Sequence, residues 1–266
     1  MRSRRWLDLA PLALVVSASA LGAAVSREPP GRLHPAQAWC GPSFERPLGC
    51  GEAGVDLLSL VSSAELRAVA LASIVSVAGL AIGAPLGAAA ALARGRFERV
   101  VERSCDLVQA LPSFILALAV LSALRTPSRA ALAAVFALTA WAPFARLALA
   151  QTRVLRDAAF VEAAVALGRG RPGVVVRHIL PNLLGVVAVQ LGSTGAAIVV
   201  SEAALAFVGF APPGGVSLGG VLDQGVAAML LAPHVLLIGG AAVFATSASM
   251  LVAGRAARSL PMGRRS

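Results

Sequence analysis

Six stretches of this chain are apolar and almost free of charge. They are Leu9–Ser26, Ala68–Ala93, Leu107–Leu124, Ala130–Ala145, Ile179–Ser201 and Val235–Gly254. A helix needs about 20 residues to cross the hydrocarbon core of a bilayer, within a range of about 17–25. The fourth stretch is shorter, but it can extend to Ala150 if the Arg146 side chain reaches toward the interface. Because lipid offers no partner to an unpaired backbone group, each stretch must be helical. The pattern therefore predicts an all-α, polytopic membrane protein with six transmembrane helices.

Proline and glycine inside these stretches modify the expected helices. Pro85, Pro112 and Pro143 lack an amide hydrogen, so we expect them to kink their helices. The segment Gly79–Gly87 carries a glycine at every fourth position. This spacing fits a close helix crossing of the small-xxx-small kind, and it fits ordinary helix packing equally well.

Composition supports lipid as the solvent. Of the 266 residues, 58% are hydrophobic and 14% are charged, whereas a soluble domain carries about 25% charge. The net charge of +10 would also suit a nucleic-acid binder, but such proteins gather their charge on one soluble face. Here the arginines lie between long apolar runs, so membrane topology explains the charge and we expect no nucleic-acid partner.

The arginines also predict the orientation of the chain. If the N-terminus lies inside, 17 of the 23 basic residues fall in inner segments and six in outer ones, as the positive-inside rule requires. The outer ones are Arg27, Arg32, Arg46, Arg67, Arg125 and Arg129. We therefore expect both termini to be cytoplasmic. The first stretch also fits a cleavable signal peptide, since small residues follow its apolar core at Ser17–Ala20. We expect an uncleaved first helix, and cleavage would leave the orientation of the other spans unchanged.

Several kinds of chemistry are excluded or unsupported. The sequence contains no lysine, which excludes P-loop, Schiff-base and pyridoxal-phosphate chemistry. His34, His178 and His234 lie on different segments, without metal-ligand spacing or a Ser-His-Asp set. Gly168–Gly173 matches the dinucleotide pattern G-x-G-x-x-G, but it follows a helical segment and Pro172 breaks the helix that should start there. We therefore expect no catalytic residue, no metal site and no cofactor bound by this chain.

The inner segment Arg153–Asn182 is more informative. Asp157 precedes a helix-forming run and is a candidate N-cap. An apolar stripe follows at i, i+4 spacing, and Gly168 permits a sharp exit with positive φ. The stripe consists of Phe160, Val161, Ala164 and Val165. A short amphipathic helix outside the lipid fits a groove of another protein. The alternative is an inert helix lying on the membrane surface.

This segment resembles the EAA loop of ABC-importer permeases. The residues that carry the resemblance are Glu162-Ala163-Ala164, Gly168 and Leu180-Pro181. The run His178–Asn182 is similar to the second permease subunit of the dipeptide/oligopeptide/nickel branch. Further similarity to this branch lies in Pro47-Leu48-Gly49, Gly54, Asp56, Phe207-Val208-Gly209, Pro212-Pro213 and Ser217-Leu218-Gly219. The resemblance covers about residues 46–255.

The resemblance implies the ABC-importer permease fold and a set of partners in a bacterial inner membrane. A second, related permease would complete the pathway, two ABC ATPase subunits would use ATP and Mg²⁺, and an extracytoplasmic solute-binding protein would deliver the solute. Permeases of this branch carry peptides, nickel chelates, opines and glutathione, and the sequence does not choose among them. The chain would be a transporter subunit and not an enzyme. The alternative is a structural or assembly subunit of the membrane without its own transport pathway.

The resemblance also assigns segments and residues. Residues 1–67 form an N-terminal helix and an extracytoplasmic segment, residues 68–255 the permease domain with its coupling loop at about 151–181, and residues 256–266 a cytoplasmic tail. Glu162, Ala163, Ala164, Gly168, Leu180 and Pro181 are expected to couple the chain to the ATPases, with the two alanines letting a partner approach closely.

Three cysteines and one carboxylate remain. Cys40 and Cys50 share the outer loop and are either disulfide partners or two free thiols, and we favour the bridge. Cys105 is expected to be a packing residue. Glu202 ends the fifth stretch at its outer side. It is a candidate pathway residue, because ionisable groups at membrane depth often line pathways, or it pairs with a neighbour in the headgroup region.

Overall fold

The computed structural model describes residues 4–26, 28–124, 128–210 and 216–258 of the chain. Pro212-Pro213, Arg27, Arg125 and the tail after Arg258 lie outside these ranges. Within them the regular elements are helices, and one isolated antiparallel bridge pairs Cys50 with Asp56. The helices are α1 (Arg4–Val25), α2 (Leu57–Ala93), α3 (Gly95–Ala110), α4 (Ser113–Ala123), α5 (Arg129–Leu155), α6 (Ala159–Ala166), α7 (Arg171–Val174), α8 (Leu180–Phe207), α9 (Leu218–Ala227) and α10 (Pro233–Arg258). Short 3-10 turns lie at Pro35–Gln37 and Glu52–Gly54, and a π-helical turn at Val175–Ile179 joins α7 to α8.

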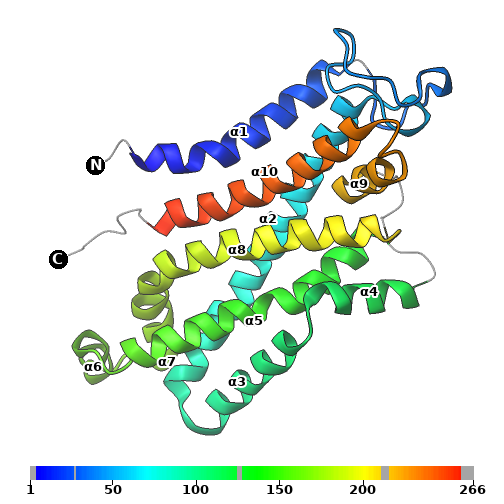
Figure 1. The fold of residues 1–266 in the computed structure, drawn as a ribbon. Helices are drawn as coiled ribbons and strands as arrows, with labels where there is room; N and C mark the ends of the chain where they lie inside the picture. The colour runs from blue at the N-terminus through cyan, green and yellow to red at the C-terminus, as the bar shows by residue number, and fades with distance from the viewer. Residues whose placement is uncertain (1–3, 27, 125–127, 211–215, 259–266) are drawn as a thin grey trace.

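Most of the long helices are suited to a membrane. In the described part of the chain, four continuous helical runs have the length and hydropathy of a span, namely α2, α5, the run Arg171–Phe207 and Pro233–Ala257. The pair α3–α4 makes a fifth, bent by 73° at its break. The apolar part of α1, Ala10–Val25, is shorter. The all-α membrane fold is thus confirmed, and six crossings are consistent with Figure 1, where α1, α2, α5, α8 and α10 run between the same two ends of the bundle.

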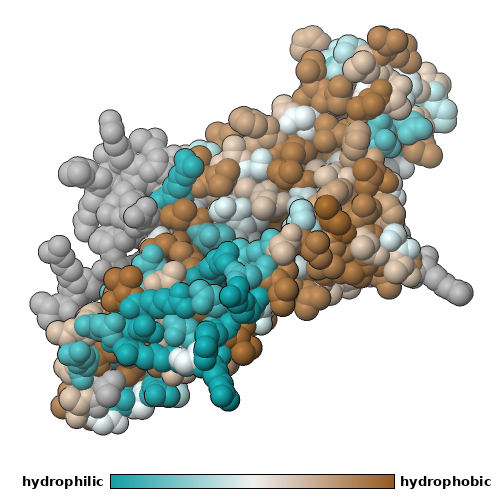
Figure 2. Space-filling view, turned by 60° about the horizontal axis from the view of Figure 1, so that its bottom comes forward, coloured by the Kyte–Doolittle hydropathy of each residue, from teal (hydrophilic) through white to brown (hydrophobic). Residues whose placement is uncertain are grey.

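The two ends differ in what they carry. The end of α2, the start of α3, the end of α5 and the helices α6 and α7 lie at one end, which we call the loop end (Figure 1). The segment that contains Cys40 and Cys50 lies at the other end with α4 and α9, and we call this the disulfide end. Figure 2 shows hydrophilic side chains gathered over the loop end, while apolar residues cover most of the remaining surface in view.

The third expected span is not one continuous helix. The expected helix Leu107–Leu124 is wrong in this respect, because α3 ends at Ala110 and α4 begins at Ser113. Leu111 is extended, with φ −101° and ψ 130°. The residue before a proline is pushed out of the helical region, and Pro112 has no amide hydrogen to continue the ladder. Pro85 and Pro143, by contrast, lie inside continuous helices.

The helices α2 and α8 are longer than their apolar stretches. The Asp56 side chain accepts a hydrogen bond from the Ser59 amide at 3.1 Å and so begins α2 at Leu57, eleven residues before the expected start. At its far end α8 continues to Phe207. Glu202 therefore lies inside a helix and does not end it, which corrects the expected boundary.

The glycines of α2 make a close crossing with α5. A Cβ added at Gly79, Gly83 or Gly87 would meet main-chain carbonyls of Ala140, Trp141 or Ala145. Only a residue without a side chain permits this approach. Of the two interpretations of the spacing, the structure therefore supports the small-xxx-small crossing.

A partly buried carboxylate attaches α1 to the bundle. Glu65 of α2 accepts hydrogen bonds from the hydroxyls of Ser19 on α1 and Thr246 on α10. Both hydroxyl-bearing residues are buried. An uncleaved first helix stays the prediction, since this contact gives α1 a place against α2 and α10.

Candidate functional site

The helix α6 lies at the loop end and presents two different sides. Val161 and Ala164 are 3% and 6% exposed and belong to a buried apolar cluster that includes Phe144 of α5 and Ile179 before α8. This cluster fixes the inner side of α6 against the bundle. Phe160 is only half-buried and stands near the His178 ring, and the side chain of Val165 lies outside the described residues.

The outer side of α6 is exposed. Glu162, Ala163 and Ala166 are exposed, and Leu167 after the helix is 88% exposed. Of the two alanines expected to admit a partner, only Ala163 faces outward, because Ala164 packs inward. The side available to another protein is therefore small-residue surface beside one carboxylate and one leucine.

Gly168 ends α6 in the left-handed region. Its φ is +78°, as the sequence predicts. The Arg169 amide donates a hydrogen bond to the Ala164 carbonyl at 3.1 Å, across the glycine, which is the longer bond of a Schellman closure. No atom lies within 4 Å of a Cβ built at Gly168. A larger side chain would thus meet no steric clash here, and glycine is favoured only because of the positive φ.

A short non-helical segment, Leu167–Gly170, separates α6 from the helical run that leads into α8. Arg171–Phe207 forms one helical run that includes the π-helical turn at Val175–Ile179. Leu180 and Pro181 begin α8, directly after this π-helical turn.

The expected N-cap at Asp157 is wrong. α6 begins at Ala159, and the Ala158 carbonyl accepts from the Val161 and Glu162 amides. The Asp157 carboxylate instead pairs with Arg94 at 2.6 Å, and both side chains are exposed. Ala158 is thus the residue directly before α6, and Asp157 stands one residue further back, outside the cap position.

A network of ion pairs, which sequence reasoning missed, holds the base of this loop. Arg153 of α5 contacts Glu98 at 2.7 Å and Glu102 at 2.8 Å, both on α3. Arg156 donates to the Ala91 carbonyl of α2 at 2.9 Å and lies 3.4 Å from Glu98. These contacts tie the end of α5 to α2 and α3. The signal available in the sequence was a pair of carboxylates at i, i+4 spacing in an otherwise arginine-rich inner segment.

One cavity between helices of the bundle has both apolar and uncharged polar residues in its lining. It measures about 310 Å³ and lies between the α3–α4 break, α5 and α8. Its polar lining includes Gln109, Ser113, Thr139, Gln190 and Ser193. Polar side chains on membrane-spanning helices are expected to face water or a solute and not lipid. The residues that line this cavity are therefore candidates for the lining of a transport pathway.

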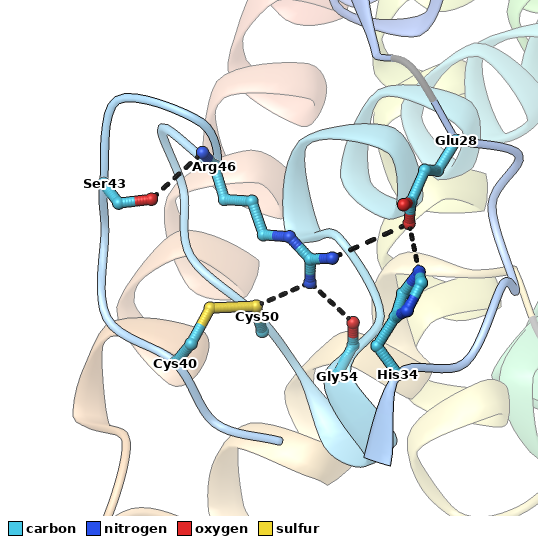
Figure 3. Close-up of a disulfide and its surroundings, with 7 residues drawn as sticks. All are labelled: Glu28, His34, Cys40, Ser43, Arg46, Cys50 and Gly54. Carbon is cyan, nitrogen blue, oxygen red and sulfur yellow. Dashed lines mark hydrogen bonds and ion pairs between the residues drawn. A yellow bond between two sulfur atoms is a disulfide. The ribbon is translucent and has the colours of Figure 1, made fainter. Parts of the chain in front are cut away.

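The segment at the disulfide end is cross-linked. Cys40 and Cys50 form a disulfide, the pairing that the sequence analysis favours. Figure 3 shows Arg46 reaching from the loop between them. Its guanidinium donates to the Gly54 carbonyl at 2.8 Å and lies 3.8 Å from Glu28, which also contacts His34 at 2.8 Å. The third cysteine, Cys105, is buried as expected for a packing residue.

The remaining predictions concern Glu202 and metal binding. Glu202 is 8% exposed and lies near Arg67 and Arg129 around a small cavity. Among the residues that the structure describes, no group of three or more His, Cys, Asp or Glu side chains could hold a metal ion.

Known proteins resemble the chain over most of its length. The model of the family described as "Binding-protein-dependent transport system inner membrane component" matches residues 83–258. The glutathione transport system permease protein GsiD of Shigella dysenteriae serotype 1 is 32% identical over 207 residues, which is 77% of this chain and 68% of that protein. The proteins of the same name from Pectobacterium atrosepticum and Escherichia coli O157:H7 are 30% and 31% identical over the same shares.

Proposed function

The chain belongs to the binding-protein-dependent transport system inner membrane components, the permease subunits of ABC importers, and from this we propose that it forms half of a pathway for glutathione or another short peptide. It is a transporter subunit and not an enzyme. The proposed solute rests on the relatives, which are named as glutathione permeases. A nickel chelate or an opine has no such support.

The observation that carries the mechanism is the two-sided helix α6. Its inner side packs on the bundle through Val161 and Ala164, and its outer side leaves Glu162 and Ala163 exposed. Small residues on that side let a partner surface approach closely. Two ATPase subunits, one on this helix and one on its counterpart in a second permease, would bind and hydrolyse ATP with Mg²⁺.

Movement would pass from α6 to the pathway through Gly168 and the run that ends in α8. ATP binding closes the two ATPases, α6 follows its partner, and Leu180 and Pro181 move with the start of α8. Gln190 and Ser193 of the same helix line the polar cavity. Closing of the ATPases would therefore shift the side chains of α8 that line the pathway of the solute.

Two features support an orientation with the loop end in the cytoplasm. The disulfide requires an oxidising compartment at the opposite end. Arginines such as Arg94, Arg103 and Arg146 are exposed at the loop end, as the positive-inside rule expects. Both termini would then be cytoplasmic, and a solute-binding protein would dock at the disulfide end.

The function is tested by uptake of labelled glutathione into proteoliposomes. The complete importer, with the second permease, the ATPases and the binding protein, should accumulate glutathione in the presence of ATP. The importer assembled without this chain should not. Equal uptake by both preparations would assign this chain a structural role and overturn the proposal.

A further inference from the structure

A small charged cavity near the disulfide end is not explained by coupling to the ATPases. It measures about 60 Å³. Its lining consists of Arg67, Leu71, Arg129, Leu132, Glu202 and Val216. These residues come from α2, α5, α8 and the segment before α9, so the fold brings three charges together from distant parts of the sequence.

Glu202 has an unmet need for a hydrogen-bond donor. The residue is 8% exposed, and its Oε2 atom is buried without a hydrogen-bond partner in the described part of the chain. A buried carboxylate is costly unless a donor or a cation completes it. A neighbouring glutamate shows the contrast, because Glu65 accepts hydroxyl hydrogen bonds on both of its oxygens. Glu202 is therefore placed for a donor that a ligand can bring.

The two arginines stand on the exposed side of the same cavity. Both Arg67 and Arg129 are exposed, and neither forms an ion pair with another residue that the structure describes. Arg129 is close enough to act electrostatically on Arg67 and on Glu202. Two guanidinium groups beside each other repel, and a carboxylate between them removes that repulsion and accepts paired hydrogen bonds.

The charged cavity lies along the same side of α5 as the polar cavity. Arg129 and Leu132 line the first, and Phe136, Thr139 and Pro143 line the second. Steps of three and four residues keep side chains on one face of a helix. A solute that leaves the charged cavity along α5 therefore meets the polar cavity next.

We propose that Arg67, Arg129 and Glu202 bind the zwitterionic end of a solute at the outer mouth of the pathway. The solute's ammonium group donates to Glu202, and its carboxylate accepts hydrogen bonds from the two guanidinium groups. The cavity is too small for a whole peptide, so it takes one end, with both charges close together, as in an α-amino acid. This inference rests on the proposed import function and specifies the chemical class of the solute.

Equilibrium binding to the importer in lipid nanodiscs tests the site. The complex contains this chain, the second permease and the ATPases, without the binding protein, so that no other solute site contributes. The probes are labelled glutathione, one end of which carries an ammonium and a carboxylate on the same carbon, and glutathione whose amino group is acetylated. Wild type should bind glutathione about tenfold more tightly than the acetylated probe, because a charge-assisted hydrogen bond is lost.

The variants separate a binding role from a structural one. Glu202→Gln should weaken glutathione binding by about tenfold and leave binding of the acetylated probe unchanged. Arg67→Gln and Arg129→Gln should weaken the binding of both probes. Two control variants should bind both probes like wild type. Glu65→Gln changes a partly buried carboxylate of the same helical bundle outside this cavity, and Arg32→Gln changes an outer arginine.

Three outcomes would overturn the inference. They are no saturable binding to wild type, equal binding of the two probes, and a Glu202→Gln effect of the same size on both probes. ATP-driven uptake of glutathione, measured on the same complex reconstituted into proteoliposomes together with the binding protein, reports the proposed function separately. Normal uptake together with any of these three outcomes would refute the proposed binding site but not the proposed function. Absence of uptake by the wild-type importer would refute the proposed function.

Discussion

Gly168 forms the backbone turn that ends α6. Gly168→Val places a β-branched side chain at φ +78°, at a cost of about 1–3 kcal/mol in local strain. We expect the variant to insert normally, because no span is touched, and to retain fewer ATPases when the tagged permease is purified. A copurification yield equal to that of wild type would show that the turn tolerates a different angle.

A glycine two residues away provides the matched control. Gly170 has φ −63°, and an added Cβ would lie 3.8 Å from the nearest atom, in Pro172. Gly170→Val should therefore copurify the ATPases like wild type. Gly168→Asn should fall between the two valine variants, since asparagine tolerates the left-handed region better than other side chains.

Arg153 is the centre of the ion-pair network at the base of the loop. Its bidentate contact with Glu102, at 3.0 and 2.8 Å, is partly exposed, so we expect the pair to contribute up to about 1 kcal/mol to the stability of the assembled importer. A double-mutant cycle with Arg153→Gln and Glu102→Gln, read by thermal unfolding of the complex, measures this directly. Strictly additive effects would mean that the contact contributes nothing.

One side of the helix α6 is buried against the bundle, and the other side is exposed. Ala163→Arg places a long charged side chain on the exposed side, where a groove of the ATPase should close around it. We expect loss of ATPase copurification with the permease still inserted and folded. Glu162→Ala should be milder, because an interface ion pair near solvent contributes little.

The inner side of α6 gives a different expectation. Ala164 is buried in the cluster with Val161 and Ile179, so Ala164→Arg should detach α6 from its own bundle and make the loop sensitive to protease. Ala163→Arg should leave the loop as resistant as in wild type. If both variants show the same protease sensitivity, the two alanines do not face opposite sides.

Local sequence predicted some of these elements well and missed others for physical reasons. Lipid forces apolar runs to be helical, so α2, α5, α8 and α10 could be anticipated, as could the exit at Gly168. The contact between Arg153 and Glu98 could not, because it joins helices α5 and α3 through packing that no spacing encodes. The charged cavity around Glu202 is of the same kind, since its three charges come from three helices.

The boundaries were predicted less well than the existence of the helices. By hydropathy, the second apolar stretch begins at Ala68 and the fifth ends at Ser201, because the adjacent residues Arg67 and Glu202 are charged. In the structure both residues lie inside helices: α2 begins at Leu57, before Arg67, and α8 ends at Phe207, after Glu202. Charge alone marks where apolar character ends, while capping and packing decide where a helix ends.

The orientation of the whole molecule follows from its two unlike ends. Reporter fusions after Arg99 and near Arg169 should be cytoplasmic, and a fusion near Gly41, within the disulfide loop, should be external. The positive-inside rule and the disulfide predict this independently. A cytoplasmic reading at Gly41 would invert the arrangement of the importer and remove the proposed site for the solute-binding protein.

The central claim is that α6 couples ATP hydrolysis by the ATPases to movement of solute through this chain. It is tested most directly by measuring, in proteoliposomes of the complete importer, the amount of glutathione taken up and the amount of ATP hydrolysed. Wild type and Gly170→Val should show uptake that depends on hydrolysis. Ala163→Arg and Gly168→Val should lose uptake. Either the ATPases no longer bind to the permease, or they still hydrolyse ATP but without transport of the solute. Normal uptake for each ATP hydrolysed in both of these variants would contradict the claim.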